Sequence, residues 1–414
     1  MIRLVATTLL FVLFTATSAG AQATVATGVS ADATDANSQP KIGRDGRGTI
    51  HLVFVRPVSG VEQVFVGSSR DGGRSWQTRQ ITAASVESRY PTLAVGPDDQ
   101  VHLAWTQYDG GVGKVYYSRF NGTRWTVPVK ISPGTAYAGV PSIAVERDGT
   151  VHLVWYGIRE QAPAVRTRHG SIYEILYSGA PGGRWSKPEV ISPGIPDSIN
   201  PTLGVDARDR LHSAWYQFDI RSYQVQHAVR TVRWNLPDQV SSGNDDAFSV
   251  AMGIGPNSSV YLVWERRSAS DIRINFGERH ERWTVQQPLS PAGQRALNPS
   301  VAADERNHLY AAWEVDGQIY LRRWEAQWLP PERLTSEGEN ANPILASGRG
   351  AVDLMWTQKV AGEQRLRFAT IAGLPGGRTG TASRSPWGLI LLVLILVAGV
   401  SVWRRMRALR VTRD

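Results

Sequence analysis

Short apolar phrases recur along the chain, and most of them end in tryptophan. They read VHLAW ending at Trp105, VHLVW at Trp155, LHSAW at Trp215, VYLVW at Trp264, LYAAW at Trp313 and VDLMW at Trp356, with a seventh copy, IHLVF, ending at Phe54. Both faces of such a phrase are apolar, whereas a strand with one face in water alternates apolar and polar positions. We therefore expect each phrase to be a strand that is covered on both faces.

A second tryptophan series interleaves with the first, and each member precedes an isoleucine, valine or leucine by five or six residues. Its members are Trp76, Trp125, Trp185, Trp234, Trp283 and Trp328. The two series repeat about every 50 residues, and a period of this size with several short strands per repeat is typical of propeller blades. The repeat over residues 141–192 contains four strand candidates separated by turn residues. The pattern predicts an all-β fold with four antiparallel strands in each blade.

Seven repeats follow from the starts of their first strands, near Pro40, Pro91, Pro141, Pro201, Val250, Pro299 and Pro343. The seventh repeat stops after its third strand, which ends at Ala372, and no tryptophan follows there. Residues 24–30, TVATGVS, end in the Val-Ser that resembles the Ile-Ser at the end of other repeats. We therefore predict a seven-bladed β-propeller over residues 24–372. The N-terminal strand completes its last blade and covers an otherwise exposed sheet edge.

The turn before the first member of the second series resembles the Asp box of BNR repeats in the sialidase-like superfamily. SRDGGRSW matches the pattern Ser-x-Asp-x-Gly-x-x-Trp at Ser69, Asp71, Gly73 and Trp76. Degenerate copies that keep Ser, Gly and Trp occur at residues 118–125 and 178–185. The resemblance covers roughly residues 30–372. It implies a propeller in which these residues form structural turns on the face opposite the ligand site.

For an enzyme of this superfamily, the resemblance also implies three arginines that hold the substrate carboxylate, a tyrosine nucleophile activated by a glutamate, and an aspartate acid/base. Two features depart from that pattern. Seven repeats exceed the six blades of the enzymes, and their early Phe-Arg-Ile-Pro motif has only a partial counterpart, Arg89-Tyr90-Pro91, which follows the first Asp box. These departures favour binding over catalysis.

Both ends of the chain predict a relation to a membrane. Residues 1–23 combine Arg3, an apolar core and a small-residue stretch, as a secretory signal peptide does. After a linker at 373–386, residues 387–403 contain no charge and have tryptophan at each edge, which is typical of a transmembrane helix. The basic tail, 404–414, favours a cytoplasmic C-terminus and an extracytoplasmic propeller at the cell membrane. LPGGRTG at 374–380 leaves sortase-type processing as a minor alternative.

Charge and cysteine usage exclude several functions. The chain has 45 basic and 36 acidic residues, and 39 and 35 remain once Arg3, the five tail arginines and Asp414 are set aside, a net charge near +4. Such a surface predicts no nucleic-acid partner. Cysteine is absent, which excludes disulfides and thiolate metal sites. Because no Gly-rich phosphate loop or metalloprotease signature is present, the sequence predicts no cofactor.

Four histidines, His51, His102, His152 and His212, occupy one place in the repeat. Histidine is a common metal ligand, so a metal site is one interpretation. The same place continues as Tyr261, Tyr310 and Asp353 in the later repeats. This substitution pattern indicates a hydrogen-bonding position inside each blade, and we predict no metal site.

The symmetry of the repeats breaks most after Trp155, where GIREQAPAVRTRHGSIY makes a loop about ten residues longer than its counterparts. Long loops in compact domains are often functional. In a propeller this connection shares a face with the blade-to-blade connections, and we expect the ligand site there. The predicted ligand-binding residues are Tyr156, Arg159, Arg166, Arg168, His169, Tyr216 and Arg266.

Further candidates on this face are Arg56, Arg89, Arg221, Glu265, Glu314, Asp197, Asp245, Asp246, Glu337 and Glu339. Mixed arginine, tyrosine and carboxylate side chains suit a sugar or an anionic group, although exposed loops are polar in any case. We predict a membrane-anchored propeller that binds a protein or carbohydrate partner without catalysis. A sialidase-like exo-glycosidase is one alternative, and it requires three of the arginines to converge beside a tyrosine and a carboxylate. An assembly scaffold is another.

Overall fold

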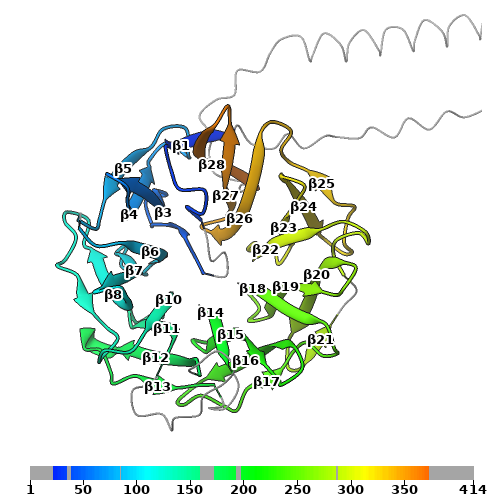
Figure 1. Cartoon of the computed structure of the whole chain (residues 1–414), viewed down its shortest axis with the longest axis horizontal. Helices are drawn as coiled ribbons and strands as arrows, with labels where there is room; N and C mark the ends of the chain where they lie inside the picture. Colours follow the sequence, from blue (N-terminus) through cyan, green and yellow to red (C-terminus); the bar gives the residue numbers. More distant parts are fainter. Residues whose placement is uncertain are drawn as a thin grey trace, which may run out of the picture. The chain divides into compact units, whose positions relative to one another are not determined.

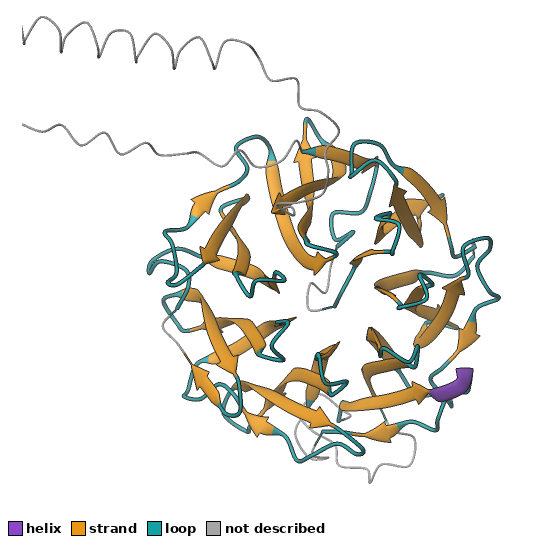
Figure 2. Cartoon of the chain, turned by 180° about the vertical axis from the view of Figure 1, so that it is seen from behind, coloured by secondary structure: helices purple, strands orange, loops and turns teal. Residues whose placement is uncertain are grey.

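The computed structural model describes residues 22–34, 39–83, 85–158, 172–192, 197–285 and 288–372. They form seven four-stranded antiparallel sheets arranged as blades around a ring (Figure 1), which confirms the predicted seven-bladed propeller. Within these ranges the one helical element is a 3-10 turn, η1 (Pro181–Gly183; Figure 2), and no helix has the length and apolarity to cross a membrane. Residues 1–21 and 373–414, which carry most of the predicted signal peptide and the predicted transmembrane segment, lie outside the described residues.

Each blade is numbered by the order of its innermost strand in the chain. Blade 1 contains β2 (Ile42–Arg44), β3 (Ile50–Val58), β4 (Val61–Ser69) and β5 (Gln77–Gln80). Blade 2 contains β6 (Ser88–Val95), β7 (Val101–Asp109), β8 (Val112–Phe120) and β9 (Val129–Lys130). Blade 3 contains β10 (Ala138–Val145), β11 (Val151–Gly157), β12 (Glu174–Ala180) and β13 (Glu189–Val190).

Blade 4 contains β14 (Ser198–Val205), β15 (Leu211–Phe218), β16 (Tyr223–Arg230) and β17 (Asp238–Gln239). Blade 5 contains β18 (Asp246–Ile254), β19 (Val260–Arg267), β20 (Ile272–Arg279) and β21 (Trp283–Val285). Blade 6 contains β22 (Ala296–Ala303), β23 (Leu309–Val315), β24 (Gln318–Trp324) and β25 (Glu332–Arg333), and blade 7 contains β26 (Glu339–Gly348), β27 (Ala351–Val360), β28 (Glu363–Ala372) and β1 (Ala23–Thr27).

The apolar phrases form the second strand of every blade, and their six tryptophans are fully buried. Trp155 packs against Ala104 of the preceding blade. Val154, on the other face of the same strand, packs against Leu203 and Trp215 of the following blade. Both faces of the strand are therefore covered by neighbouring blades, as the absence of alternation predicts.

Five of the six tryptophans in the second series tie successive blades together by edge-to-face ring contacts, whereas Trp125 contacts Phe120 of its own blade. The pairs, with their centroid separations, are Trp76–Phe368 (5.0 Å), Trp185–Tyr117 (5.1 Å), Trp234–Tyr177 (5.3 Å), Trp283–His227 (4.9 Å) and Trp328–Phe276 (5.2 Å). In each pair the partner ring belongs to the third strand of the preceding blade, in the edge-to-face arrangement that aromatic pairs favour. Because Phe368 lies on β28, the contact with Trp76 joins the first blade to the last.

The hydroxyl residue that ends a repeat has a structural role. Its oxygen accepts a hydrogen bond from a backbone amide of the third strand in the same blade, with N···O distances of 2.8–3.0 Å. The accepting residues are Thr82, Ser132, Ser192, Ser241, Ser290 and Thr335. These bonds fix the point at which the chain leaves one blade for the next.

The ring is closed by the N-terminal strand. β1 pairs antiparallel with β28, so that Ala23 lies opposite Phe368 and Thr27 opposite Arg365. The connection to the first blade then runs inward, where the Thr34 hydroxyl donates to the Asn342 carbonyl of the last blade (3.0 Å). The closing strand predicted over residues 24–30 is thus present over 23–27, and the remaining residues belong to this connection.

Candidate functional site

The Asp-box residues form a turn between β4 and β5 whose hydrogen bonds stay within the turn. The Ser69 hydroxyl donates to Asp71 (2.8 Å) and accepts from the Gly73 amide (2.8 Å), and the Trp76 indole donates to the Gly73 carbonyl (3.0 Å). The Ser75 hydroxyl donates to Asp71 (2.6 Å), and this bond above all holds the pKa of that carboxyl well below its usual range. The geometry is that of a structural turn.

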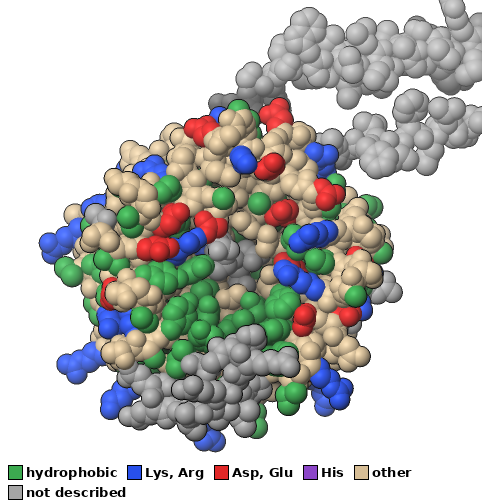
Figure 3. Space-filling view, viewed as in Figure 1, with side chains coloured by type: hydrophobic (Ala, Val, Ile, Leu, Met, Phe, Trp, Pro, Cys, Tyr) green, Lys and Arg blue, Asp and Glu red, His purple; other side chains and the backbone are tan. Residues whose placement is uncertain are grey.

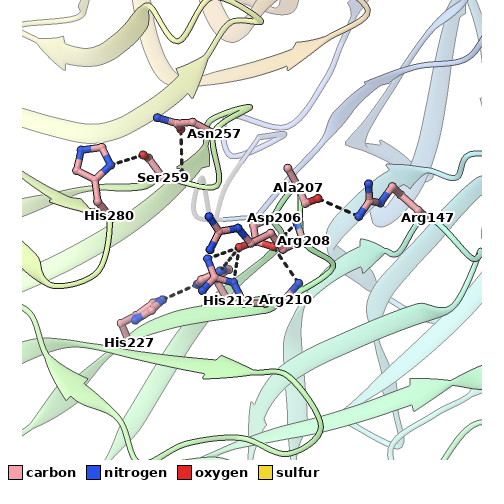
Figure 4. A network of polar contacts seen from close by, with 10 residues as sticks. All are labelled: Arg147, Asp206, Ala207, Arg208, Arg210, His212, His227, Asn257, Ser259 and His280. Atoms are coloured by element: carbon pink, nitrogen blue, oxygen red, sulfur yellow. Dashed lines mark hydrogen bonds and ion pairs between the residues drawn. The ribbon is translucent and has the colours of Figure 1, made fainter.

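The repeated histidines lie inside the blades and bond to neighbouring side chains. His212 approaches His227 through Nδ1 (3.1 Å) and Asp206 through Nε2 (3.2 Å), as Figure 4 shows. His102 and His152 each bond through Nδ1 to a tyrosine hydroxyl of the third strand, at 2.7 and 2.8 Å. Burial lowers the pKa of His102, His152 and His212 to about 4. No group of three acidic or histidine side chains in the described ranges is placed to hold a metal ion.

The opposite end of the ring opens around the starts of the innermost strands, and we call this region the channel mouth. Six of these strands begin with a β-bulge. In each of them one residue, directly before the proline that starts the repeat or before Val250 in blade 5, has a positive φ of 52–53°. These residues are Tyr90, Val140, Asn200, Ser249, Asn298 and Asn342. Positive φ is strained for residues other than glycine, and such strain concentrates at functional sites.

In blades 2, 5 and 6, the residue that follows the tryptophan of the first series lies at the seam with the next blade, beside the strained bulge. Thr106 accepts a hydrogen bond from the Val140 amide (2.9 Å), and Glu265 accepts one from the Asn298 amide (2.8 Å). Tyr156, which follows Trp155, packs toward the next blade in the same way. The sequence register thus delivers one side chain from each of these blades to the mouth.

Tyrosines dominate the mouth over blades 2 to 5, and we call this set the tyrosine arc: Tyr90, Tyr108, Tyr137, Tyr156, Tyr173, Tyr216 and Tyr223. The rings of Tyr137 and Tyr156 lie 5.6 Å apart and that of Tyr173 lies 5.4 Å from Tyr156, whereas Tyr216 lies 5.3 Å from Phe248. In Figure 3, hydrophobic side chains, tyrosine included, gather around the centre on the side of β6, β10, β14 and β18. Burial raises the pKa of Tyr156 and Tyr216, which are therefore neutral phenols.

Beside the tyrosine arc the mouth is lined by two glutamates, Glu265 and Glu314, which are both hydrogen-bonded to Asn298. Glu265 is fully buried and pairs with Arg267 (2.7 Å) while its other oxygen accepts from the Asn298 amide. Glu314 is half-buried, and it accepts from the Asn298 side chain (3.2 Å) and from the Asn342 amide (3.4 Å). Burial raises the pKa of Glu314, and the neighbouring charge of Glu265 adds to the effect. These bonds fix both carboxylates in position.

Below the mouth, the innermost strands β14, β18, β22 and β26 enclose a cavity of about 270 Å³ that Gln39 and Pro40 also line. Gln39 lies across the channel, where its side-chain nitrogen donates to the Pro201 carbonyl at 3.0 Å. The walls of the cavity are mostly the apolar and small side chains of these four strands. Glu265, Glu314 and Asn298 therefore lie above the cavity, whereas the Gln39 amide lies in its wall.

Three of the arginines considered for a carboxylate-binding triad have separate partners. Arg56 lies over the Phe65 ring (4.1 Å to the centroid), Arg89 pairs with Asp32 and Glu87, and Arg266 pairs with Asp245 (2.7 Å). Arg221 is exposed, and Arg159 lies outside the described residues. A tyrosine–glutamate nucleophile is likewise not assembled from Tyr216 and Glu265, because the Tyr216 hydroxyl bonds to Asn200 (2.5 Å) and Glu265 is occupied as above.

Of the predicted ligand-binding residues, the structure brings Tyr156 and Tyr216 together in the tyrosine arc. It places Arg266 at the seam of blade 5 with Asp245. Arg159, Arg166, Arg168 and His169 lie outside the described residues. The sequence reasoning missed Tyr137, Tyr173, Phe248 and the asparagines of the bulges, although the Asn-Pro start shared by three repeats at Asn200, Asn298 and Asn342 was a usable signal.

The comparisons with known proteins are limited to the fold. No model of a known protein family matches the sequence, and no curated protein matches it. An ulvan lyase of polysaccharide lyase family 25 has a TM-score of 0.58 at 10% identity, over 85% of this chain and 97% of that one. An α-L-arabinanase from Penicillium chrysogenum complexed with arabinobiose gives 0.51 at 11% identity, over 85% and 97%. The Hadza microbial sialidase Hz136 gives 0.50 at 11% identity, over 75% and 73%.

The propeller therefore resembles the folds of glycan-active enzymes. At these identities the likeness concerns the fold alone. Membership of the BNR repeat family stays a prediction that rests on the Asp-box residues.

Proposed function

We propose that this chain is an extracytoplasmic, membrane-anchored propeller that binds a glycan at its channel mouth without cleaving it. The observation that carries the proposal is the tyrosine arc beside Glu314 and Asn298. Sugar rings present apolar C–H faces that pack on aromatic rings, and their hydroxyls pair with carboxylates and amides, so a few fixed polar groups beside aromatic walls suit a carbohydrate. Export and anchoring are supported by residues 1–23 and 387–403 of the sequence.

The fold neighbours add support at the level of ligand class, because an arabinanase complexed with arabinobiose and an ulvan lyase bound to a GlcA–Rha3S unit share the architecture. Absence of cleavage is supported by the separate engagement of Arg56, Arg89 and Arg266, and by the partners of Tyr216 and Glu265. In the described residues each of these groups bonds to a partner other than the one that the sialidase mechanism requires.

The test is glycan-array screening of the full-length protein, followed by calorimetry with the best oligosaccharide. Tyr156→Ala should weaken binding at least about tenfold, since one aromatic contact of this kind contributes about 0.5–1.5 kcal/mol beyond its buried area. Tyr320→Ala is the matched control, because Tyr320 is half-buried on β24 and packs in the core of blades 5 and 6. Equal loss in both variants, or no glycan retained by the wild type, would contradict the proposal.

A second candidate function is glycoside hydrolysis, and the raised pKa of Glu314 favours it. A half-buried carboxyl with a raised pKa is suited to act as a general acid. Release of a fluorescent aglycone from aryl glycosides, abolished by Glu314→Gln, would support this function over binding alone.

A further inference from the structure

The sector of the mouth above β22 and β26 holds an acceptor whose charge is not compensated. Glu265 pairs with Arg267, and Asp245 pairs with Arg266. Glu314 differs from both: in the described part of the chain no lysine or arginine lies within ion-pair distance of it, and its partners are the neutral N–H groups of Asn298 and Asn342. The nearby exposed Arg295 is the smallest of the influences on the Glu314 carboxyl and forms no ion pair with it. A fixed, half-buried carboxylate without an ion pair is energetically costly unless a ligand supplies the charge.

A second acceptor without a donor lies next to the same two strands. The Gln39 side chain is 2% exposed. Its nitrogen must face the Pro201 carbonyl, because a carbonyl only accepts hydrogen bonds, and this fixes the direction of its Oε1. Oε1 has no donor among the described residues. Gln39 lines the cavity together with Ser300 and Ile344, each two residues beyond the asparagines that hold Glu314.

We propose that the ligand group recognised above β22 and β26 is an ammonium group, carried by the free amine of an amino sugar. An ammonium offers three N–H donors and no acceptor, which complements a carboxylate and a bare amide oxygen. The aromatic faces of the tyrosine arc also attract cations. This inference rests on the proposed glycan binding and adds to it the class of sugar.

The same features disfavour an anionic sugar. Three of the described arginines at the mouth, Arg89, Arg266 and Arg267, already pair with acidic side chains. A uronate or sialate above β22 would face two carboxylates, Glu314 and Glu265, against the one exposed arginine that precedes this strand, Arg295.

The test measures binding of three trisaccharides to the full-length protein by calorimetry: glucosamine, N-acetylglucosamine and galacturonate trimers. The glucosamine trimer should bind at least about tenfold more tightly than its acetylated counterpart, which is the scale of a charge-assisted hydrogen bond. Glu314→Gln should remove this preference while keeping an oxygen acceptor for Asn298 and Asn342. Glu332→Gln is the matched control, since Glu332 is an exposed carboxylate on the outer strand β25 that pairs with Arg323 (3.6 Å).

The outcomes separate the two proposals. If the acetylated trimer binds as tightly as the amine, or if Glu314→Gln retains the preference, the ammonium inference is wrong and glycan binding stands. If no trisaccharide binds and the array is empty, glycan binding itself is wrong. Tri-lysine serves as a second source of ammonium groups: binding as tight as that of the glucosamine trimer, and insensitive to Tyr156→Ala, would overturn the assignment to a sugar.

Discussion

Acid sensitivity should reside in the blades that carry histidine, and blade 2 allows a clean test. His102 is 3% exposed, and its ring lies 6.1 Å from that of Tyr117. Blade 5 has Tyr261 and Phe276 at the same two places, also 6.1 Å apart. The double substitution His102→Tyr with Tyr117→Phe therefore copies a pair that the fold already accommodates, and it removes one buried imidazole.

The magnitude follows from the pKa of His102, which burial lowers from 6.5 to about 4. Between these values the unfolded chain binds the proton and the folded chain does not, so the free energy of unfolding falls as the pH falls through this window. From pH 7 to pH 5 the loss is about 2 kcal/mol, and it reaches about 3 kcal/mol below pH 4. At pH 7 and above this contribution is fully retained.

Urea denaturation at pH 7, 6 and 5 measures the difference. The free energy of unfolding of the double variant should fall by about 2 kcal/mol less than that of the wild type over this range. The reciprocal variant, Tyr261→His with Phe276→Tyr, should lose more than the wild type. Parallel curves for all three proteins would refute the link between the buried imidazole and acid sensitivity.

Three further predictions concern the fold. Val25→Asp, on the buried face of β1, should lower the free energy of unfolding by at least about 2 kcal/mol, whereas Thr27→Asp on its exposed face should cost little, as urea unfolding would show. Gly73→Ala brings a Cβ within 2.4 Å of a ring on β28 and should cost about 1–3 kcal/mol more than Gly72→Ala, which has a similar positive φ and open space; equal melting temperatures would contradict this. Ser192→Ala removes the hydrogen-bond acceptor of a buried backbone amide of β12 and should lower the free energy of unfolding by about 1–3 kcal/mol. An unchanged midpoint of urea unfolding would contradict this.

The blades were predictable because the same pattern is repeated seven times. Each tryptophan phrase must be covered on both faces, and the ring of blades is the arrangement that covers all of them. The position of Tyr156 and Tyr216 at the mouth was equally predictable, since register fixes the residue that follows each tryptophan.

Other parts of the site were not predictable from the repeat. Tyr137 and Tyr173 come from connections rather than strands, and their rings meet only because two connections of blade 3 fold toward each other. The pairing of Arg266 with Asp245 depends likewise on loop geometry. The sequence analysis took Arg89 and Arg266 to be available for a ligand, whereas in the structure both pair with acidic side chains. Local composition cannot reveal which opposite charge a loop will bring within reach.

The pairing of β1 with β28 has a consequence for the order in which the molecule can be made. Among the described strands, β1 is the first to be synthesised and its partner β28 is the last, so β1 must wait until nearly the whole ring has been made. At ordinary rates of about 5–20 residues per second, the delay is roughly 20 to 70 seconds. During that time an edge strand stands unpaired and open to other chains. A chaperone that holds extended segments would be expected to bind residues 23–27 during this delay.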